Sequence, residues 1–241
     1  MKILVCIKPD TDGQDLGHFE ALALEAGLVL KETCMDHCRV DVITAGPREY
    51  EAVVRRAFGM GADNGIHILT QTPDQDQGLV PASMTASLLA RAIGESAYDL
   101  ILTGVMSQDL MAGQTGPMVA QLLGLPCATA VVKIGIQGSL LAAEQELDRG
   151  YRAQLEITLP ALVTIQAGFY TPRYPTLSNM LKAGNKSIVT HEEQEFVPGL
   201  PREIFLGTRE PEKTRDARMV VGTLEEQLDI FHGFLREKHL L

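Results

Sequence analysis

The sequence predicts an α/β fold in which a mostly parallel, doubly wound sheet carries helices on both faces. Short apolar runs rich in β-branched residues alternate with longer segments whose apolar residues recur at helical spacing, from residue 2 to residue 134. Such alternation favours parallel strands that are joined by crossover helices. After residue 135 the alternation stops, so we expect a different arrangement in the last part of the chain.

The first four elements have recognisable ends. "KILVCIK" (2–8) is an apolar run with β-branched residues, and "FEALALEAGLVLKE" (19–32) has helical spacing. The next strand, "RVDVITA" (39–45), ends at Gly46-Pro47. The amphipathic helix that follows, 49–61, carries the glycines that stop it.

Five further elements continue the alternation by the same criteria. We expect strands at 65–70 (GIHILT), 98–103 (YDLILT) and 127–134 (CATAVVKI), and helices at 81–94 and 117–124. In sheets of this kind, ligands bind beyond the carboxyl ends of the strands.

The remaining sequence predicts a hairpin, one more buried strand and an extended C-terminal arm. "SLLAAEQEL" and "YRAQLEITL" are joined around 148–150 as a β-hairpin, and "ALVTIQ" (161–166) is strand-like. No clear strand follows in "YTPRYPTLSNMLKAGNK", and 187–218 is polar with little periodicity. The chain then closes with an amphipathic helix that opens on Thr223 and Glu226 in capping-box spacing.

We therefore expect two domains. Residues 1–186 form an α/β domain that includes a loop at 170–186, and residues 187–241 form the arm and its helix. An arm of this kind is hard to bury on its own domain, so we expect it to pack on a partner subunit.

Composition excludes several classes of protein. The chain has 241 residues, 45% of them hydrophobic, and a net charge of −10, which argues against a nucleic-acid binder. No apolar stretch approaches the roughly 20 residues of a membrane span. The amino terminus passes directly into a strand pattern, so we expect a cytoplasmic protein without a signal peptide. "CMDHC" brings Cys34, His37 and Cys38 together, but no second cluster completes a metal site, and we predict none.

The segment "GVMSQDLMAGQTGPM" (104–118) is too long for a simple connection between a strand and a helix. Thr115 and Pro117 suit an N-cap and a first helical turn, so we expect the helix to start near residues 115–117. Gly113 and Gly116 allow backbone to approach a ligand. Free N–H groups at a helix start bind phosphate. Ser107, Gln114 and Thr115 can donate hydrogen bonds, and Asp109 can accept one from ribose or adenine, although a ligand-free capped helix or an ordinary turn residue would fit too.

Other nucleotide and catalytic signatures are absent from the sequence. The first strand is followed by "PDTDGQD", which is neither G-x-G-x-x-G nor a Ser-Gly-Gly phosphate loop. The chain contains no P-loop motif and no G-x-S-x-G nucleophile elbow. The sequence therefore offers no positive sign of catalysis by this chain alone, and we predict no catalytic residues.

Nearly end to end, the sequence resembles the β subunit of electron transfer flavoproteins. The resemblance rests on "KILVCIKP", "FEALALEAG", "AGPREYEAVVRRAFGMGAD", the loop 104–115 with its "QTG", and above all "LPALVTI" followed by "PRYPTLSNMLKA". The resemblance and the element order together imply a nucleotide-α-hydrolase-like version of the predicted fold.

This resemblance implies a heterodimer with a homologous α subunit that supplies most of the site for an electron-carrying FAD. The β subunit would hold AMP, or a second FAD in electron-bifurcating members. Matched residue by residue, the cofactor-binding positions are Cys6, Phe19, Ala45, Gly104, Met106, Ser107, Asp109, Gly113, Gln114 and Thr115. Phe19 would lie near the flavin held by the α subunit; it would equally suit the core side of the first helix.

Leu177 matches the apolar anchor with which the family grips acyl-CoA and other dehydrogenases, and electrons would leave to a quinone or an iron-sulfur acceptor. A leucine on a loop between Pro175 and Asn179 has the look of a docking residue, although it could pack on its own domain.

Three departures from the family pattern indicate a divergent subgroup. The segment 9–18 is short and has Gly17-His18 in place of the usual Asn-Pro. Gln145 and Arg149 depart from the usual residues around the hairpin, and Ser178 stands where proline is common. Because rim charges tune the choice of partner, we expect the weakly basic segment after Leu177 to dock a dehydrogenase whose surface is differently charged.

Three alternatives stay open on the sequence. The first is a bifurcating subunit with a second FAD and NADH as donor, but the short segment 9–18 weakly favours AMP. The second is a stand-alone nucleotide-binding regulatory module that resembles universal stress proteins, which would not explain "PRYPTLSNMLKA" or the arm. The third is an ATP pyrophosphatase-like enzyme, which would need the missing Ser-Gly-Gly loop.

Overall fold

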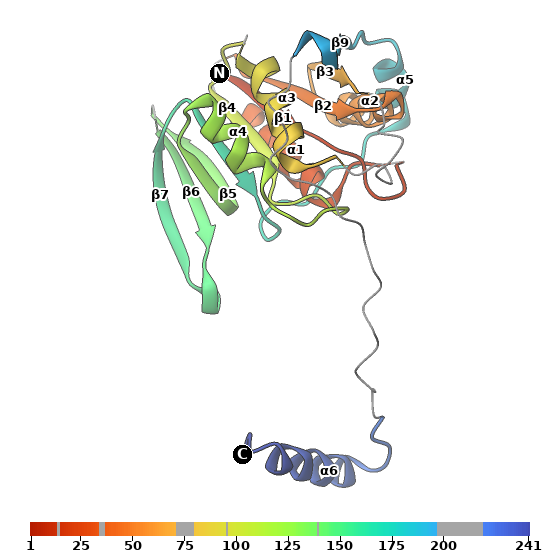
Figure 1. Cartoon of the computed structure of the whole chain (residues 1–241), viewed down its shortest axis with the longest axis vertical. Coiled ribbons are helices and arrows are strands. Elements are labelled where there is room, and N and C mark those ends of the chain that lie inside the picture. The colour runs from red at the N-terminus through yellow and green to blue at the C-terminus, as the bar shows by residue number, and fades with distance from the viewer. Residues whose placement is uncertain (14, 34–36, 71–79, 95, 139, 197–218) are drawn as a thin grey trace. The chain divides into compact units, whose positions relative to one another are not determined.

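The computed structural model describes residues 1–13, 15–33, 37–70, 80–94, 96–138, 140–196 and 219–241. Within these residues, nine strands form one sheet in the order β7-β6-β5-β8-β4-β1-β2-β3-β9 (Figure 1). The strands are β1 Lys2–Cys6, β2 Arg39–Gly46, β3 Asn64–Leu69, β4 Leu100–Gly104, β5 Cys127–Gln137, β6 Leu140–Glu146, β7 Arg152–Thr158, β8 Ala161–Ile165 and β9 Val189–Glu192.

Most of the sheet is parallel, as the sequence predicts. β1 pairs in parallel with β2 and with β4, and β4 pairs in parallel with β8. β5 continues this parallel part beside β8, and β6 and β7 then fold back antiparallel at one edge. The predicted hairpin turns at residues 148–150, where Arg149 and Gly150 have positive φ angles of 61° and 77°. The predicted α/β class with an added hairpin is confirmed.

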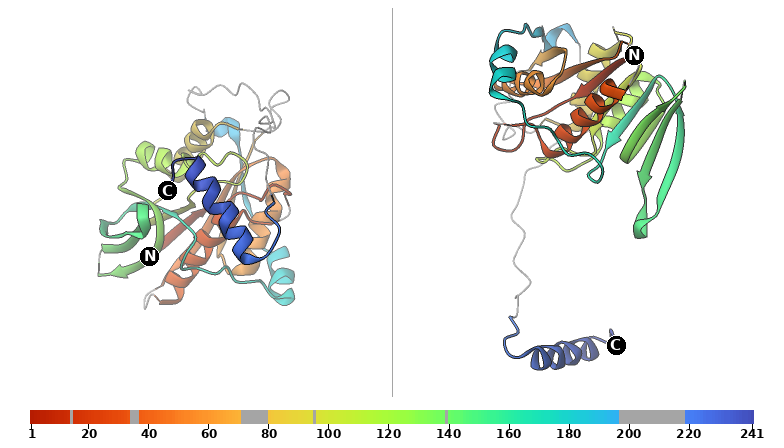
Figure 2. Two further views of the ribbon diagram at one scale, coloured as in Figure 1. Left: turned by 90° about the horizontal axis from the view of Figure 1, so that it is seen from below. Right: turned by 180° about the vertical axis from the view of Figure 1, so that it is seen from behind.

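Helices cover both faces of the sheet. The helices of this unit are α1 His18–Thr33, α2 Glu51–Met60, α3 Ala82–Gly94, α4 Thr115–Leu123 and α5 Leu177–Gly184. Figure 1 shows α3 and α4 in front of the sheet, and the view from behind in Figure 2 shows α1 on the opposite face.

The two faces of β1 show why every residue of this strand after Lys2 is apolar and buried. Ile3 and Val5 belong to the core cluster under α1 and α2, whereas Leu4 belongs to the cluster under α3 and α4. Successive side chains of a strand point to opposite faces, so a strand that is covered on both sides buries every residue.

The sequence pattern missed two elements after residue 170. Leu177 does not lie on a loop: it is the first residue of α5, whose N-cap Thr176 accepts a hydrogen bond from the Asn179 N–H. β9 pairs in parallel with β3 from Ile66↔Val189 onward, although its segment has little periodicity. Both elements are short and mostly exposed, and they are stabilised by contacts with distant parts of the chain.

The chain divides into two compact units, Met1–Phe205 and Leu206–Leu241. The second contains α6, Leu224–Glu237, which opens on the predicted capping box of Thr223 and Glu226. The arm between 197 and 218 lies outside the described residues, and the expected domain division at 186 stays a prediction. None of the described helices is long and apolar enough to cross a membrane.

Candidate functional site

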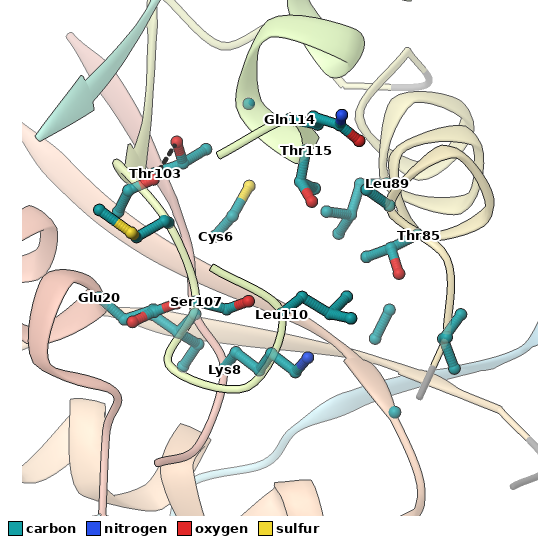
Figure 3. A pocket seen from close by; sticks show the side chains of 18 of the residues that line it. Cys6, Lys8, Glu20, Thr85, Leu89, Thr103, Ser107, Leu110, Gln114 and Thr115 are labelled. Carbon is teal, nitrogen blue, oxygen red and sulfur yellow. Dashed lines mark hydrogen bonds between the residues drawn. The ribbon is translucent and has the colours of Figure 1, made fainter. Parts of the chain in front are cut away.

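A cavity of about 330 Å³ opens at the carboxyl ends of β1, β2 and β4. β1 is followed by β2 and β3 on one side and has β4 on the other, so the order of the sheet reverses between β1 and β4. Open α/β sheets place their ligand crevices at such switch points. The wall across from the strands comes from α3, and the loop 105–116 closes the cavity (Figure 3).

Eight of the ten predicted cofactor-binding residues line this cavity. They come from the ends of three strands and from the loop before α4: Cys6, Ala45, Gly104, Met106, Ser107, Gly113, Gln114 and Thr115. Phe19 and Asp109 are not among the lining residues. Phe19 is half-buried and packs against the core cluster under α1, next to the exposed His18 ring at 5.1 Å. The fold thus brings together residues that are up to 109 positions apart.

The start of α4 faces the cavity. The helix begins at Thr115, within the predicted range, but the N-cap residue is Gln114 rather than Thr115, and its side chain makes no capping hydrogen bond. Gln114, Thr115 and Gly116 all line the cavity. Because the N–H groups of a first helical turn carry partial positive charge, this edge of the cavity suits an anion such as a phosphate.

Two glycines allow the close packing that shapes the site. A Cβ on Gly116 would lie 2.7 Å from the Thr103 Oγ1 and 2.8 Å from the Thr164 Cγ2, so α4 approaches the sheet closely at its first turn. Gly113 has a positive φ of 64°, which a side chain would strain. Gly116 therefore serves helix–sheet packing as well as the cavity wall.

Asp109 faces Lys8 rather than the cavity. The Lys8 ammonium donates to the Asp109 carboxylate, and the Leu110 N–H donates to the other carboxylate oxygen at 2.8 Å. Burial raises the pKa of Asp109, but the hydrogen bonds from Lys8 and Ser107 outweigh it and lower the pKa overall. The pair ties the loop after β4 to the chain just beyond β1. Lys8 is the one lysine or arginine among the described residues that line the cavity.

Glu20 is a lining residue that the sequence analysis did not single out. It lies in the first turn of α1 with only 6% of its surface exposed, and its Oε2 has no hydrogen-bond partner among the described residues. Burial raises its pKa to about 7. Cys6 shows a similar effect, since burial raises the pKa of its thiol to about 12 and keeps it protonated. Cys6 thus contributes to the shape of the cavity and does not act as a nucleophile.

The sequence pattern also did not predict which residues form the apolar wall of the cavity. Thr85, Leu88 and Leu89 of α3 line it, as does the Tyr50 ring beside the end of β2. Periodicity identified 81–94 as a helix, but a helix pattern does not tell which of its residues face a ligand. Lys8 could have been predicted, because it lies two residues beyond the carboxyl end of β1.

The segment around α5 presents apolar side chains to solvent. Leu177 is 78% exposed, and Tyr174 and Leu181 are also exposed. Hydrogen bonds from two arginines fix the chain before and after α5. Arg173 donates to both Glu25 oxygens, with the Nη2–Oε1 distance at 2.8 Å, and Arg55 donates to the carbonyl oxygens of Ala183, Gly184 and Lys186.

No metal-binding cluster of histidine, cysteine and carboxylate side chains occurs in the described part of the chain. Cys34 of the "CMDHC" segment lies outside the described residues.

Comparison with known proteins assigns a family. The model of the electron transfer flavoprotein domain matches residues 7–195. The human protein named electron transfer flavoprotein subunit beta is 30% identical over 231 residues, covering 93% of this chain and 89% of that protein. The bacterial subunit of Thermoanaerobacterium thermosaccharolyticum is 29% identical over 228 residues, with 91% and 85% covered. A mitochondrial subunit of rice, Oryza sativa, is 30% identical over 250 residues, with 95% and 96% covered. The chain therefore belongs to the electron transfer flavoprotein family, as a β subunit.

Proposed function

We propose that this chain binds AMP in the cavity at the β1–β4 switch point and joins an α subunit that holds most of the site for FAD. The complex would take electrons from dehydrogenases that dock on the α5 segment and pass them to a quinone or iron-sulfur acceptor, in the cytoplasm. The observation that carries the nucleotide assignment is the convergence of Gly104, Ser107 and Gln114–Thr115 on one cavity.

The chemistry of the lining fits the parts of an adenine nucleotide. The uncapped first turn of α4 and the Lys8 ammonium suit a phosphate. Leu88, Leu89 and Tyr50 offer an apolar surface for a base, and Ser107 and Thr85 offer hydroxyl groups for a ribose. Small-molecule sites combine an apolar lining with a few polar groups in this way.

The size of the cavity favours a mononucleotide. The volume lined by described residues is about 330 Å³, which is near the lower end of the roughly 300–1,000 Å³ range of ligand pockets. FAD carries a second nucleotide-sized half and would need a larger or more open site. The small volume therefore supports AMP, which the short segment 9–18 also favours.

This chain would contribute to electron transfer by binding and orienting the cofactors. FAD, when bound in the complex, supplies the redox chemistry, and protein groups tune and position it. No described residue of the cavity needs to act as a nucleophile, and the protonated Cys6 thiol would leave the bound nucleotide intact.

A cofactor count on the purified αβ complex tests the assignment. We expect one FAD and one AMP per complex after denaturation and chromatography of the released nucleotides. Two FAD molecules per complex and no AMP would instead support the bifurcating form with NADH as donor, and a complex without any nucleotide beyond one FAD would refute the cavity assignment.

Replacing Asp109 tests the loop itself. The Asp109→Ala substitution removes the partner of Lys8, so the loop after β4 loses its tie to β1, and we expect the AMP content to fall about tenfold. Asp148→Ala, in the exposed hairpin turn, is the matched control and should retain AMP. Unchanged AMP content in Asp109→Ala would contradict the proposed role of the loop.

A further inference from the structure

Glu20 is a buried acid that the packing of the protein does not explain. Its side chain lies in a cavity wall, its Oε2 is buried, and no described residue donates to that oxygen. Buried polar atoms in native proteins nearly always have partners, and an exception inside a ligand cavity needs a reason. The simplest reason is a donor that arrives with the ligand.

The chain makes room for this carboxylate. A Cβ on Gly17 would lie 2.3 Å from the Glu20 Oε2 and 2.9 Å from its Cδ, so any other residue at position 17 would displace the side chain. Gly17 therefore provides the space that the Glu20 carboxylate occupies.

The surroundings of Glu20 favour a neutral donor rather than a cation. The Lys8 ammonium lowers the pKa of Glu20 and the Asp109 carboxylate raises it, but Lys8 itself donates to Asp109. Among the described residues, the other titratable groups that line the cavity are the Cys6 thiol and the Tyr50 hydroxyl, and burial raises the pKa of both, so they stay neutral. A phosphate would be repelled by the carboxylate, which leaves the hydroxyl and amino groups of a nucleotide as donors.

We propose that the Glu20 carboxylate accepts a hydrogen bond from an N–H or O–H group of the bound nucleotide, so that the nucleotide and a proton compete for this side chain. The inference rests on the proposed nucleotide site and adds to it a specificity residue and a pH-dependent affinity.

The direction of the pH dependence follows from linkage. Without ligand, burial keeps the pKa of Glu20 at about 7. A donor from the ligand stabilises the charged form, so it lowers this pKa and binding releases a proton. Affinity should therefore rise as the pH increases through about 7, and it should level off above that pH.

The test uses the full-length chain, freed of nucleotide and titrated with AMP by calorimetry between about pH 5.5 and 8.5. Glu20→Gln keeps the shape of the side chain but cannot titrate. The ratio of wild-type affinity to Glu20→Gln affinity should rise at least about tenfold across this range. The phosphate of AMP titrates equally with both proteins and cancels from the ratio. Glu32→Gln, on the exposed side of α1, should show the same pH profile as the wild type.

Ligand analogues identify the donor. The wild type and Glu20→Met are titrated with AMP, 2′-deoxy-AMP, 3′-deoxy-AMP and the purine riboside monophosphate that lacks the 6-amino group. Relative to AMP, one analogue should bind the wild type with about tenfold lower affinity. The same analogue should bind Glu20→Met with less than about twofold lower affinity, because that variant already lacks the hydrogen bond. Equal losses in both proteins for every analogue would overturn the proposal.

The remaining outcomes separate this inference from the proposed function. If both proteins bind AMP with a constant affinity ratio across the pH range, the role of Glu20 is wrong and the nucleotide site stands. If the chain binds no AMP, both are wrong. Should the Glu20 variants fail to fold, proton release by the wild type decides alone: the release that AMP causes near pH 7 must fall with the analogue that lacks the donor.

Discussion

Gly104 stands at the point where the end of β4 meets the first turn of α1. A Cβ on this residue would lie 2.8 Å from the Phe19 Cβ, 2.9 Å from the Phe19 carbonyl carbon and 3.1 Å from the Glu20 N. Two of these atoms belong to backbone, which cannot rotate away as a side chain can. The glycine that ends β4 before the loop 105–114 is thus also the contact that places Phe19 and Glu20, although the family resemblance explains it only by a ligand.

We expect Gly104→Ala to lower the free energy of unfolding by about 1–3 kcal/mol, because the new methyl group forces strand and helix apart. Gly135→Ala in β5 is the control, since a Cβ there meets nothing within 4 Å. Thermal denaturation followed by circular dichroism measures both. Equal stability of Gly104→Ala and the wild type would show that α1 shifts without cost.

At the scale of elements, α5 is positioned by long-range contacts rather than by its own length. Arg173 joins the chain before α5 to Glu25 and Glu32 of α1, and these hydrogen bonds raise the pKa of the guanidinium. Met180 packs where Gly59 of α2 leaves room, since a Cβ on Gly59 would lie 2.3 Å from its sulfur. An eight-residue helix is marginal alone, so these contacts explain its stability.

Replacing Arg173 tests this anchoring. The Arg173→Met substitution leaves the Glu25 side chain, which is 8% exposed, without its charged partner, and we expect a loss of about 2–4 kcal/mol in the free energy of unfolding. Adding Glu25→Gln should recover much of that loss. Arg152→Met, whose partner Glu144 lies on β6 of the hairpin, should cost much less, because a pair near the surface is screened by solvent. Urea denaturation compares the variants, and a small cost for Arg173→Met would contradict the anchoring.

The exposed face of α5 carries the docking prediction. Because the Leu177 side chain is 78% exposed, Leu177→Ala should leave the thermal midpoint nearly unchanged. Its loss from an interface should raise the KM for a partner dehydrogenase about tenfold, with little change in kcat. Leu122→Ala, on the exposed side of α4, is the matched control. A steady-state electron-transfer assay with the complex measures the KM. An unchanged KM would show that Leu177 is not part of the docking surface.

At the scale of the whole molecule, α6 has a stripe of apolar side chains that its own unit does not bury. Leu224, Leu228 and Phe231 recur at helical spacing and are 72%, 46% and 53% exposed. An amphipathic helix with an exposed apolar face is stable when another surface covers it. The α subunit is the partner that this family membership suggests.

We expect a chain that ends at residue 218 to keep the thermal midpoint of the sheet unit, because α6 belongs to a separate compact unit. The same truncation should abolish or strongly weaken association with the α subunit, because the apolar stripe is lost. Size-exclusion chromatography of the co-expressed subunits measures this association, with the full-length chain as reference. A truncated chain that still elutes as the heterodimer would place the interface elsewhere.

The sequence by itself determined the α/β class, the alternating elements up to residue 134 and the hairpin. These follow from local periodicity and turn chemistry, and the loop 104–115 is recognisable because its glycines and hydroxyl residues are adjacent in the chain. The family match adds the β-subunit identity, since the resemblance extends over nearly the whole sequence.

Only the tertiary structure decided which residues meet. β9 and α5 lack a strong local pattern, and they exist because β3 and α2 offer them a partner. Asp109 turns to Lys8, a residue 101 positions away, instead of to the cavity. Glu20 has an ordinary place in an amphipathic helix, and its burial beside Gly17 depends on how α1 meets β4. Such contacts join distant segments, so no local pattern in the sequence encodes them.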